Sequence, residues 1–276
     1  MSSVRVSVII PSRGCVYLKY ALIGLRRQTV RPYEVVLVLK ECEVKMVEGV
    51  CARLGLPCKL IEQRRGYFTH ALNLGKIEAG GDILLFTDDD AIPLERWIER
   101  YVRLHGAYPD AAGIASRDIY LRFETASLRP TPDDKPMIRL YRWLIRPWLE
   151  RPHPLLEKYK LGVYITKNLE IAHGPCIPEM TCFSLLFRGV NMSFKTSYIY
   201  DAWFPEHELL KRAPYNEQYL ALQLVLKGFD TIYVPNNPVL HINRGESLSR
   251  TEKAHEIYTE KVIMKVFFKE LIKRAA

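Results

Sequence analysis

The stretch GDILLFTDDDAIP, residues 81–93, joins a short apolar run to three consecutive aspartates. The run Ile83–Phe86 is continuous and apolar, which predicts a strand buried on both faces, and Pro93 stands where a following helix would begin. The aspartates therefore fall where strand becomes loop. Three like charges this close together need a cation or hydrogen-bond donors to offset their repulsion. The stretch favours a cation site at the end of a buried strand, with a solvated acidic turn as the alternative.

With 276 residues and 48% hydrophobic content, the chain can form one large α/β domain or two small ones. Lys and Arg number 40 against 31 Asp and Glu, a net charge of +9. This charge favours anionic partners: nucleotides, polyphosphates, nucleic acid or acidic lipid surfaces. No apolar run is long enough to span a bilayer, and the N-terminus lacks the organisation of a signal peptide. These features predict a cytoplasmic protein.

The six cysteines show no paired Cys-x-x-Cys spacing. This argues against a structural zinc site and makes buried thiols the default expectation. A low content of Asn and Gln beside abundant Arg, Lys, Glu and Tyr hints at a thermophile, in which intracellular disulfides become an alternative.

The first half of the chain alternates strand-like and helix-like segments. Apolar, β-branched runs lie at residues 4–10, 33–39, 58–63 and 82–87, and helical patterns between them cover Tyr17–Val30, Glu43–Leu54 and Phe68–Ala79. This alternation predicts right-handed βαβ units and a mostly parallel sheet, whose ligands bind beyond the carboxyl ends of the strands. The residues that follow the four strands should face one crevice: Pro11, Ser12 and Arg13; Lys40 and Glu41; Gln63, Arg64 and Arg65; and Asp88, Asp89 and Asp90.

The regular pattern ends at about residue 122. Residues 122–174 are rich in Pro, Arg and aromatics, and a segment longer than an ordinary connection predicts a functional insertion or lid. Regular patterns return at residues 182–194, with a helix expected at Asn216–Lys227, a strand at 231–235 and a final helix at Glu252–Lys273. We expect a single domain, residues 1–276, with four parts: a nucleotide-binding half (1–121), the insertion or lid (122–174), an acceptor half (175–250) and a C-terminal amphipathic helix (251–276).

Six segments, one of which contains the three aspartates, stand in a characteristic order: VSVIIPSRG with LRRQTVRPYEVVLV, RRGYFTHALNLGKIEAGGDILLFTDDDAIP, RGVNMSFK, WFPE, YNEQYLALQLVLKGF and YVPNNPVLHINRGES. Together they resemble glycosyltransferase family 2, inverting enzymes with the nucleotide-binding GT-A fold. The likeness covers residues 4–121 and 182–250, and it implies an α/β fold of GT-A type with a mostly parallel, Rossmann-like sheet flanked by helices. Leu39 departs from the family, which usually has a base-contacting aspartate there, and Glu217 replaces the usual aspartate of the second acidic element.

The resemblance implies metal-dependent, inverting transfer of a sugar from a nucleoside-diphosphate sugar to an acceptor hydroxyl. Such a transfer must stabilise negative charge on the leaving diphosphate, which a hard cation such as Mg²⁺ or Mn²⁺ does through oxygen ligands. By analogy with the family, Asp90 would bind the metal directly, and Asp88 would contact the ribose or the metal. His241 is a candidate third ligand that would favour Mn²⁺. A structural histidine is the alternative.

Glu217 is the candidate general base. It lies in the first turn of a predicted helix, whose dipole favours an ionised carboxylate, although an ordinary first-turn glutamate would look the same. Glu206 is the reserve candidate. Donor binding is assigned to Pro11, Ser12, Arg13, Arg64, Arg65, Asn73, Asp88 and Asp89, and acceptor contacts to Asn191, Trp203 and Glu206. The alternatives are solvated loop arginines, an exposed helical asparagine and a tryptophan packed in the core.

Three alternatives to a glycosyltransferase are also compatible with parts of the sequence. A nucleotidyltransferase would use the same metal site, but PSRGCVYLKY is a poor version of its glycine-rich, lysine-containing phosphate loop. A nucleic-acid-binding module is supported by the net charge and by Arg139–Trp148, yet it leaves the aspartates unexplained. A non-catalytic sugar-binding relative is opposed by the presence of both Asp90 and Glu217. We therefore expect a nucleotide-sugar donor, a glycan or lipid-linked acceptor, and no nucleic acid.

Two amphipathic segments point to peripheral association with an anionic membrane at its cytoplasmic face. In residues 138–156, arginines oppose apolar side chains, and three prolines predict a short helix, a kink and a loop that carries Trp148 to headgroup depth. The basic residues are Arg139, Arg142 and Arg146, opposite Leu140, Tyr141, Leu144 and Ile145; the C-terminal helix adds Lys265, Lys269 and Lys273, with Met264, Phe268 and Leu271 on another face. Such elements favour reversible docking. The alternative is that both helices pack on the domain or on the second subunit of a homodimer.

Overall fold

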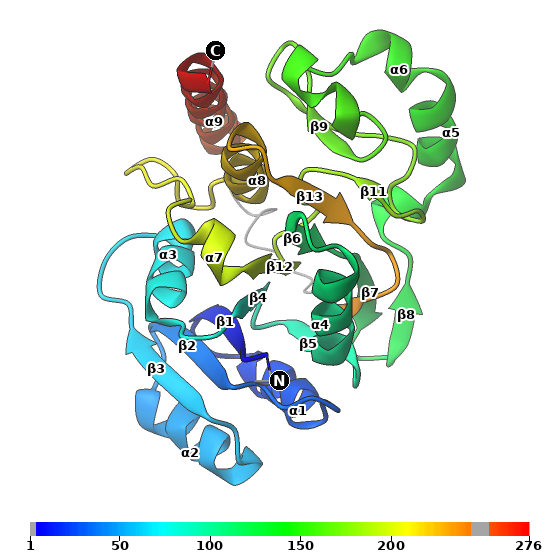
Figure 1. Ribbon diagram of the computed structural model, residues 1–276. Coiled ribbons are helices and arrows are strands. Elements are labelled where there is room, and N and C mark those ends of the chain that lie inside the picture. The colour runs from blue at the N-terminus through cyan, green and yellow to red at the C-terminus, as the bar shows by residue number, and fades with distance from the viewer. Residues whose placement is uncertain (1–3, 244–253, 276) are drawn as a thin grey trace.

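The computed structural model describes residues 4–243 and 254–275 of the protein. Its centre is an eight-stranded sheet with the order β11-β13-β6-β12-β4-β1-β2-β3 (Figure 1). Four strands of the N-terminal half run parallel to one another: β1 (Val6–Arg13), β2 (Glu34–Lys40), β3 (Cys58–Glu62) and β4 (Ile83–Thr87). Their carboxyl ends meet at one edge of the sheet, which confirms the predicted α/β architecture.

The other half of the sheet is mixed. In it, β12 (Asn191–Lys195) lies antiparallel between β4 and β6 (Ala111–Ala115). Beyond β6, β13 (Asp230–Tyr233) runs parallel to it, and β11 (Cys182–Phe183) pairs antiparallel with β13. Because β12 is antiparallel to both neighbours, β6 points the same way as β4.

The central strands are buried on both faces, and alternate residues enter two separate cores. In β1, Ile9 packs in one core, whereas Val8 and Ile10 pack in the other. The core around Ile9 is completed by α3 (Phe68–Glu78), α7 (Thr196–Ile199), α8 (Asn216–Leu226) and α9 (Ala254–Ala275), and the other by α1 (Leu18–Arg26), α2 (Val44–Leu54) and α4 (Trp97–Ala107). Strands that alternate between two apolar layers are typical of a sheet covered by helices on both faces.

A second, four-stranded sheet begins directly after the three aspartates. Its order is β5 (Ala91–Pro93), β14 (Val239–Ile242), β7 (Asp118–Arg122) and β8 (Ser127–Arg129). The prediction of a helix starting at Pro93 is wrong, because residues 91–93 pair with β14 and α4 begins only at Trp97. The pairing places His241 opposite Ala91, next to the last aspartate.

The segment 122–174 folds into a series of short elements. After β8 come η1 (Pro132–Asp134), α5 (Pro136–Leu144), α6 (Arg146–Leu149), η2 (Pro154–Tyr159), β9 (Val163–Ile165) and β10 (Ile171–His173). Leu156, Tyr159 and Tyr164 join the same core as Ile9, so the inner part of the insertion packs on the main sheet. In Figure 1, α5 and α6 lie on its outer side, away from that sheet.

The two amphipathic segments differ in what they bury. Met264 and Phe268 of α9 are fully buried, so the apolar face of this helix packs on the domain and is not free to meet a membrane, contrary to the docking hypothesis. Arg142 of α5 is buried instead, while Trp143 is 60% exposed. The predicted role of all three arginines of residues 138–156 at a lipid surface therefore needs correction, because Arg142 turns into the protein.

Four cysteines form two disulfides, and two remain thiols. The pairs are Cys15–Cys42 and Cys51–Cys58, and the thiols are Cys176 and Cys182. The default expectation of buried thiols is therefore wrong for four of the six. The first pair forms because the loops after the adjacent strands β1 and β2 lie side by side, although 27 residues separate the two cysteines.

In the two described ranges, no helix is both long and apolar enough to cross a bilayer. Residues 244–253 lie outside the described residues. They include the end of the predicted acceptor half and the start of the predicted final helix, Glu252.

Candidate active site

The three aspartates after β4 have different surroundings. Asp89 is buried, and its carboxylate accepts a 2.6 Å hydrogen bond from the hydroxyl of Ser12 at the end of β1. Asp88 and Asp90 instead lie together with His241. The backbone is held in place by Ile242, whose N–H donates to the carbonyl of Asp90 at 2.8 Å. Asp89 therefore ties the end of β4 to the end of β1, and its two neighbours lie beside His241.

Asp88, Asp90 and His241 form a group that can hold a metal ion. One carboxylate oxygen from each aspartate and one imidazole nitrogen lie within 4.8 Å of one another. Asp90 is buried, whereas Asp88 and His241 are partly buried. Nε2 of His241 is 3.4 Å from Oδ1 of Asp90. Atoms within this span can surround a single divalent cation, and two carboxylates with one imidazole suit Mn²⁺ or Mg²⁺, with the nitrogen favouring Mn²⁺.

The other ring nitrogen of His241 is held by Asp118, the first residue of β7. The distance from Nδ1 to Oδ2 of Asp118 is 2.9 Å, and Asp118 is fully buried. Burial lowers the pKa of His241, but the hydrogen bonds and charges of Asp118 and Asp90 outweigh burial and raise it to about 10. A cation that binds this imidazole must displace a proton, so metal affinity should increase with pH.

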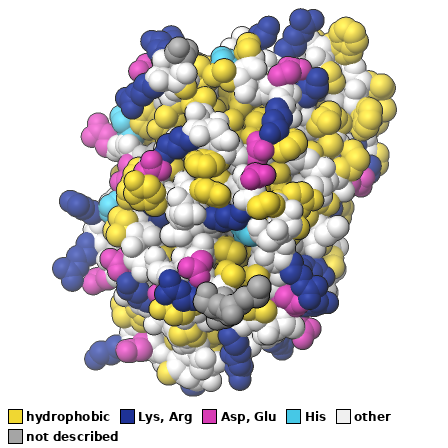
Figure 2. Space-filling view, viewed as in Figure 1, with side chains coloured by type: hydrophobic (Ala, Val, Ile, Leu, Met, Phe, Trp, Pro, Cys, Tyr) yellow, Lys and Arg dark blue, Asp and Glu magenta, His cyan; other side chains and the backbone are white. Residues whose placement is uncertain are grey.

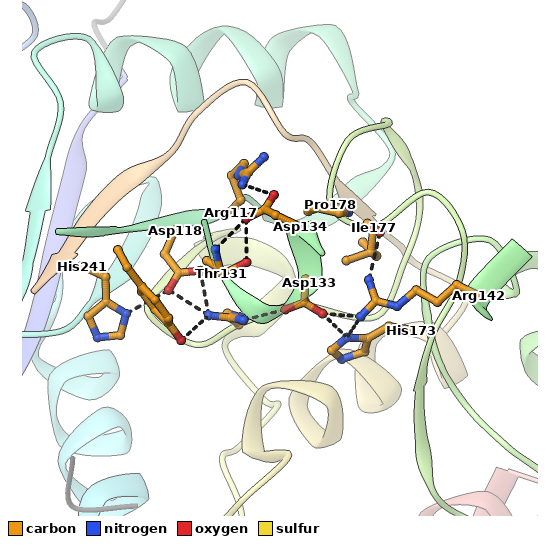
Figure 3. A network of polar contacts seen from close by, with 12 residues as sticks. Arg117, Asp118, Thr131, Asp133, Asp134, Arg142, His173, Ile177, Pro178 and His241 are labelled. Atoms are coloured by element: carbon orange, nitrogen blue, oxygen red, sulfur yellow. Dashed lines mark hydrogen bonds and ion pairs between the residues drawn. The ribbon is translucent and has the colours of Figure 1, made fainter. Parts of the chain in front are cut away.

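A buried series of ion pairs continues from Asp118 into the insertion (Figure 3). Arg188 donates to both oxygens of Asp118 at 2.9 Å and to Asp133 at 2.6 Å. Asp133 also pairs with Arg142 and lies 3.2 Å from Nδ1 of His173. Burial raises the pKa of Asp133, but His173, Arg188 and Arg142 hold it well below its ordinary range. The histidine of the metal group is thus connected to α5 through charged side chains.

Sequence reasoning missed this series of ion pairs. Asp118 stands at the start of a strand, two residues after Ser116, and Arg188 directly precedes the Gly189 of the RGVN segment. A charged residue next to a matched motif was the available signal for Arg188. Asp133 lies in the irregular insertion, where no periodic pattern marked it.

Glu217 lies in the first turn of α8, half-buried beside Gly189. A Cβ at Gly189 would stand 3.9 Å from Oε2 of Glu217, so the carboxylate sits against this backbone. The pKa of Glu217 is raised above that of a free glutamate, because burial outweighs the backbone hydrogen bonds at Glu217 and Gly189, which lower it. A raised pKa improves proton acceptance near neutral pH. Two residues beyond Gly189, Asn191 pairs with Thr87, the last residue before the aspartates.

The arginines predicted to meet the diphosphate are exposed at the ends of β1 and β3. Arg13 forms a 2.7 Å ion pair with Glu41, which follows β2. Arg64 pairs with Glu62 at 3.3 Å, and Arg65 is exposed. These guanidinium groups therefore stand at the carboxyl ends of β1 and β3, as the sequence predicts, while their contact with a diphosphate stays a prediction; Pro11 is buried within β1.

Asn73 is buried in α3, not an exposed helical asparagine, and it is hydrogen-bonded to Glu206. Nδ2 of Asn73 donates to Oε1 of Glu206 at 2.6 Å, and its Oδ1 accepts from the N–H of Phe204 at 3.0 Å. Oε2 of Glu206 lies 2.9 Å from Nδ1 of His70. Glu206 and His70 line a pocket of about 410 Å³ that also includes Gly66. Asn73 therefore holds the loop that brings Glu206 to the pocket beside the end of β3.

Asn191 and Trp203 are not brought to the metal group. Asn191 is fully buried; its Oδ1 accepts from Trp97 and Tyr101, and its Nδ2 donates to two backbone carbonyls. The donors and the acceptor of this amide are all used in hydrogen bonds within the protein, so the side chain is not available to bind a ligand. Trp203 is 43% exposed, but its backbone bonds to Gln223 in the second half of α8, nearly two helical turns beyond the candidate base.

The model of a protein family described as Glycosyl transferase family 2 matches residues 7–162. A comparison with curated protein sequences gives no match.

Solved structures share the fold at low sequence identity. S. aureus TarS 1-349 in complex with UDP-GlcNAc has a TM-score of 0.61 and 16% identity, over 95% of this chain and 66% of that one. GalNAc-T7 with UDP, GalNAc and Mn²⁺ has a TM-score of 0.66 and 14% identity, over 88% and 44%. PcManGT, a mannosyltransferase from Pyrobaculum calidifontis in complex with GDP-Man and Mn²⁺, has 0.60 and 17%, over 99% and 65%. This chain therefore spans less than two thirds of the length of each.

The fold, the Asp88, Asp90 and His241 group and the family match agree. The match covers more than half of the chain. The chain belongs to glycosyl transferase family 2.

Proposed function

We propose that this chain transfers a sugar from a nucleoside-diphosphate sugar to an acceptor hydroxyl, with a divalent metal and with inversion at the sugar. The observation that carries the proposal is the convergence of Asp88, Asp90 and His241 at the crevice edge of the sheet. The similar structures support it, since TarS and PcManGT hold UDP-GlcNAc and GDP-Man, and GalNAc-T7 and PcManGT hold Mn²⁺.

The residues of the site divide the work of the transfer. Asp88, Asp90 and His241 would hold Mg²⁺ or Mn²⁺, which when bound supplies positive charge for the leaving diphosphate. Asp118 orients the imidazole so that Nε2 faces the aspartates. Glu217 accepts the proton of the attacking hydroxyl. That oxygen bonds to the anomeric carbon as the bond to the diphosphate oxygen breaks, and a single displacement of this kind inverts the anomeric centre.

The donor would lie along the loops that follow β1, β3 and β4. Ser12 and Asp89 keep two of these loops in register. The exposed guanidinium groups of Arg13, Arg64 and Arg65 are suited to bidentate contacts with the diphosphate. Glu206 remains the proposed acceptor contact, because it lines a pocket next to these loops.

The proposed acceptor is a glycan or a lipid-linked molecule. The proposed place of the reaction is the cytoplasm or the cytoplasmic face of a membrane. A nucleotidyltransferase would use the same metal group, and the products separate the two activities. Sugar transfer releases a nucleoside diphosphate and leaves the acceptor glycosylated, whereas nucleotidyl transfer from a nucleoside triphosphate releases pyrophosphate. Chromatography of the nucleotide products from a panel of donors tests this choice.

The substitution Glu217→Gln tests the role of the base. We expect transfer to fall by about a hundredfold or more while donor affinity stays nearly unchanged, because the amide keeps the shape but cannot accept the proton. Turnover at saturating donor and isothermal titration with the donor measure the two quantities. The matched control is Glu48→Gln, at an exposed glutamate of α2. Weakened donor binding with normal turnover would instead make Glu217 a donor contact.

A further inference from the structure

The outer face of α5 and α6 is apolar and exposed to solvent. Figure 2 shows hydrophobic side chains gathered at the upper right, where α5 and α6 lie in the same view. Seven large side chains of this stretch are at least 48% exposed: Met137, Leu140, Trp143, Leu144, Ile145, Trp148 and Leu149. A contiguous apolar surface of this kind is uncommon on a soluble monomer and marks a binding surface.

Two arginines of the same helices, Arg142 and Arg146, point inward, and their contacts decide which face is outside. Arg142 is buried and donates to the carboxylate of Asp133 and the carbonyl of Ile177. Arg146 donates to the carbonyl of His173 at 2.8 Å. These bonds withdraw Arg142 and Arg146 from the outer face of the two helices. They also hold the opposite, apolar face toward solvent, because a rotation of the helix would break the buried ion pair between Arg142 and Asp133.

A cationic pocket opens beside this apolar face. It has a volume of about 650 Å³, and its lining includes Arg142, Arg146, Arg151, Lys160 and Lys167, with Glu157 as the acidic residue among the described lining. Pro147 also lines the pocket, while the next residue, Trp148, is 76% exposed. The pocket and the apolar face therefore meet at α6.

The charge of this part of the chain is strongly positive. Between residues 135 and 175 there are eight Lys or Arg and three Glu, a net charge of +5 out of the chain's +9. Arg151 and Lys167 are exposed, and their backbones are joined by a 3.1 Å hydrogen bond. Two cations are thus held close together at the rim of the pocket.

We propose that the outer face of α5 and α6 docks this domain on the surface of an anionic phospholipid bilayer. Trp143 and Trp148 lie at headgroup depth, where amphipathic aromatic rings are favoured. Arg151 and Lys167 lie beside the lipid phosphates, which their charge complements. The docking does not require sugar transfer, because this surface shares no residue with the Asp88, Asp90 and His241 group.

A second copy of the chain fits this face less well than a bilayer. A symmetric dimer through α5 and α6 would place the same patch of both subunits in contact. It would add the exposed cations Arg151 and Lys167 of both subunits to one interface, and like charges across an interface are unfavourable. The negative charge that this surface lacks is supplied by anionic headgroups.

Co-sedimentation with vesicles tests the proposal. Neutral phosphatidylcholine vesicles are compared with mixed vesicles of phosphatidylcholine and phosphatidylglycerol. We expect binding to the mixed vesicles that weakens with salt. The pair Trp143→Ser and Trp148→Ser should lower this binding by about tenfold or more. The pair Arg151→Glu and Lys167→Glu should lower binding to the mixed vesicles by a similar factor.

The control variant is Tyr200→Ser, which removes an aromatic ring that is 70% exposed outside the insertion and should leave vesicle binding unchanged. Thermal unfolding checks that each variant is folded. Negligible binding of the wild-type protein to both kinds of vesicle would overturn the proposal. So would binding that survives the loss of both tryptophans. A dimer in analytical ultracentrifugation that the same pair of tryptophan substitutions dissociates would assign the face to a second copy of the chain.

Discussion

Helices α5 and α9 are both amphipathic with basic residues, yet they present opposite faces to the protein. In α9, Met264 and Phe268 are fully buried and the lysines lie outside. In α5, Arg142 is buried and large apolar side chains such as Trp143 lie outside. The same kind of sequence pattern therefore buries its apolar face in α9 and a basic side chain in α5.

The difference comes from what each helix packs against. The partner of α9 is α8, whose Leu220 and Leu224 belong to the same apolar core as Phe268. The partner of α5 is η1, where Asp133 presents a carboxylate that is buried with Arg142 against it. A helical pattern defines two faces, but the neighbouring element decides which face is buried.

The largest contrast is expected between matched aromatic truncations in the two regions. Phe268→Ala should lower the free energy of unfolding by about 3–5 kcal/mol, because it leaves a cavity in the core. Trp148→Ala, on the exposed face of α6, should change it by no more than about 0.5 kcal/mol. Denaturation in guanidinium chloride measures both. A loss at Trp148 as large as that at Phe268 would mean that the outer face of α6 is covered.

The next largest loss of stability is expected when the ion pairs that orient α5 are broken. Asp133→Asn should cost about 3 kcal/mol, because it leaves Arg142 and Arg188 buried beside a neutral amide. The control is Glu179→Gln, which weakens the exposed pair between Glu179 and Arg139 and should cost less than about 1 kcal/mol. Equal effects of the two substitutions would show that Asp133 is not what orients the helix.

A smaller effect is expected in acid. The pKa of Asp133 is lowered in the folded protein, with His173, Arg188 and Arg142 outweighing burial. The stability that these bonds contribute is therefore present above the pKa of an unfolded aspartate, near pH 4, and is lost as pH falls below it. The free energy of unfolding of wild type should decline more steeply below about pH 4 than that of Asp133→Asn. Parallel curves would contradict the lowered pKa.

Much of the fold could be predicted, because its signals are local. Four short apolar runs separated by helical patterns indicated β1 to β4, and the aspartates at the end of β4 indicated a cation site. The order of the matched segments placed His241 near them, although 150 residues separate it from Ala91, its partner in the sheet. Each of these inferences rests on a periodic pattern or a motif at known spacing.

The remaining features depend on contacts between distant parts of the chain. Asn191 matched a motif position, yet its side chain is saturated by Trp97, Tyr101 and two carbonyls. The bond between Cys15 and Cys42 requires knowing that two loops meet. No sequence pattern predicts which side chains will form ion pairs or hydrogen bonds with a buried carboxylate such as Asp133. These are properties of the packed structure, and they also decided the orientation of α5.

The measurement that tests the central claim most directly is donor turnover by Asp90→Ala, with and without added Mn²⁺ and in EDTA. We expect wild type to release nucleoside diphosphate from its donor only with metal, and Asp90→Ala to lose about a thousandfold or more, because the leaving diphosphate loses its charge partner. The control is Asp110→Ala, at an exposed aspartate before β6, on the opposite edge of the sheet. Wild-type turnover by Asp90→Ala in EDTA would contradict the metal assignment.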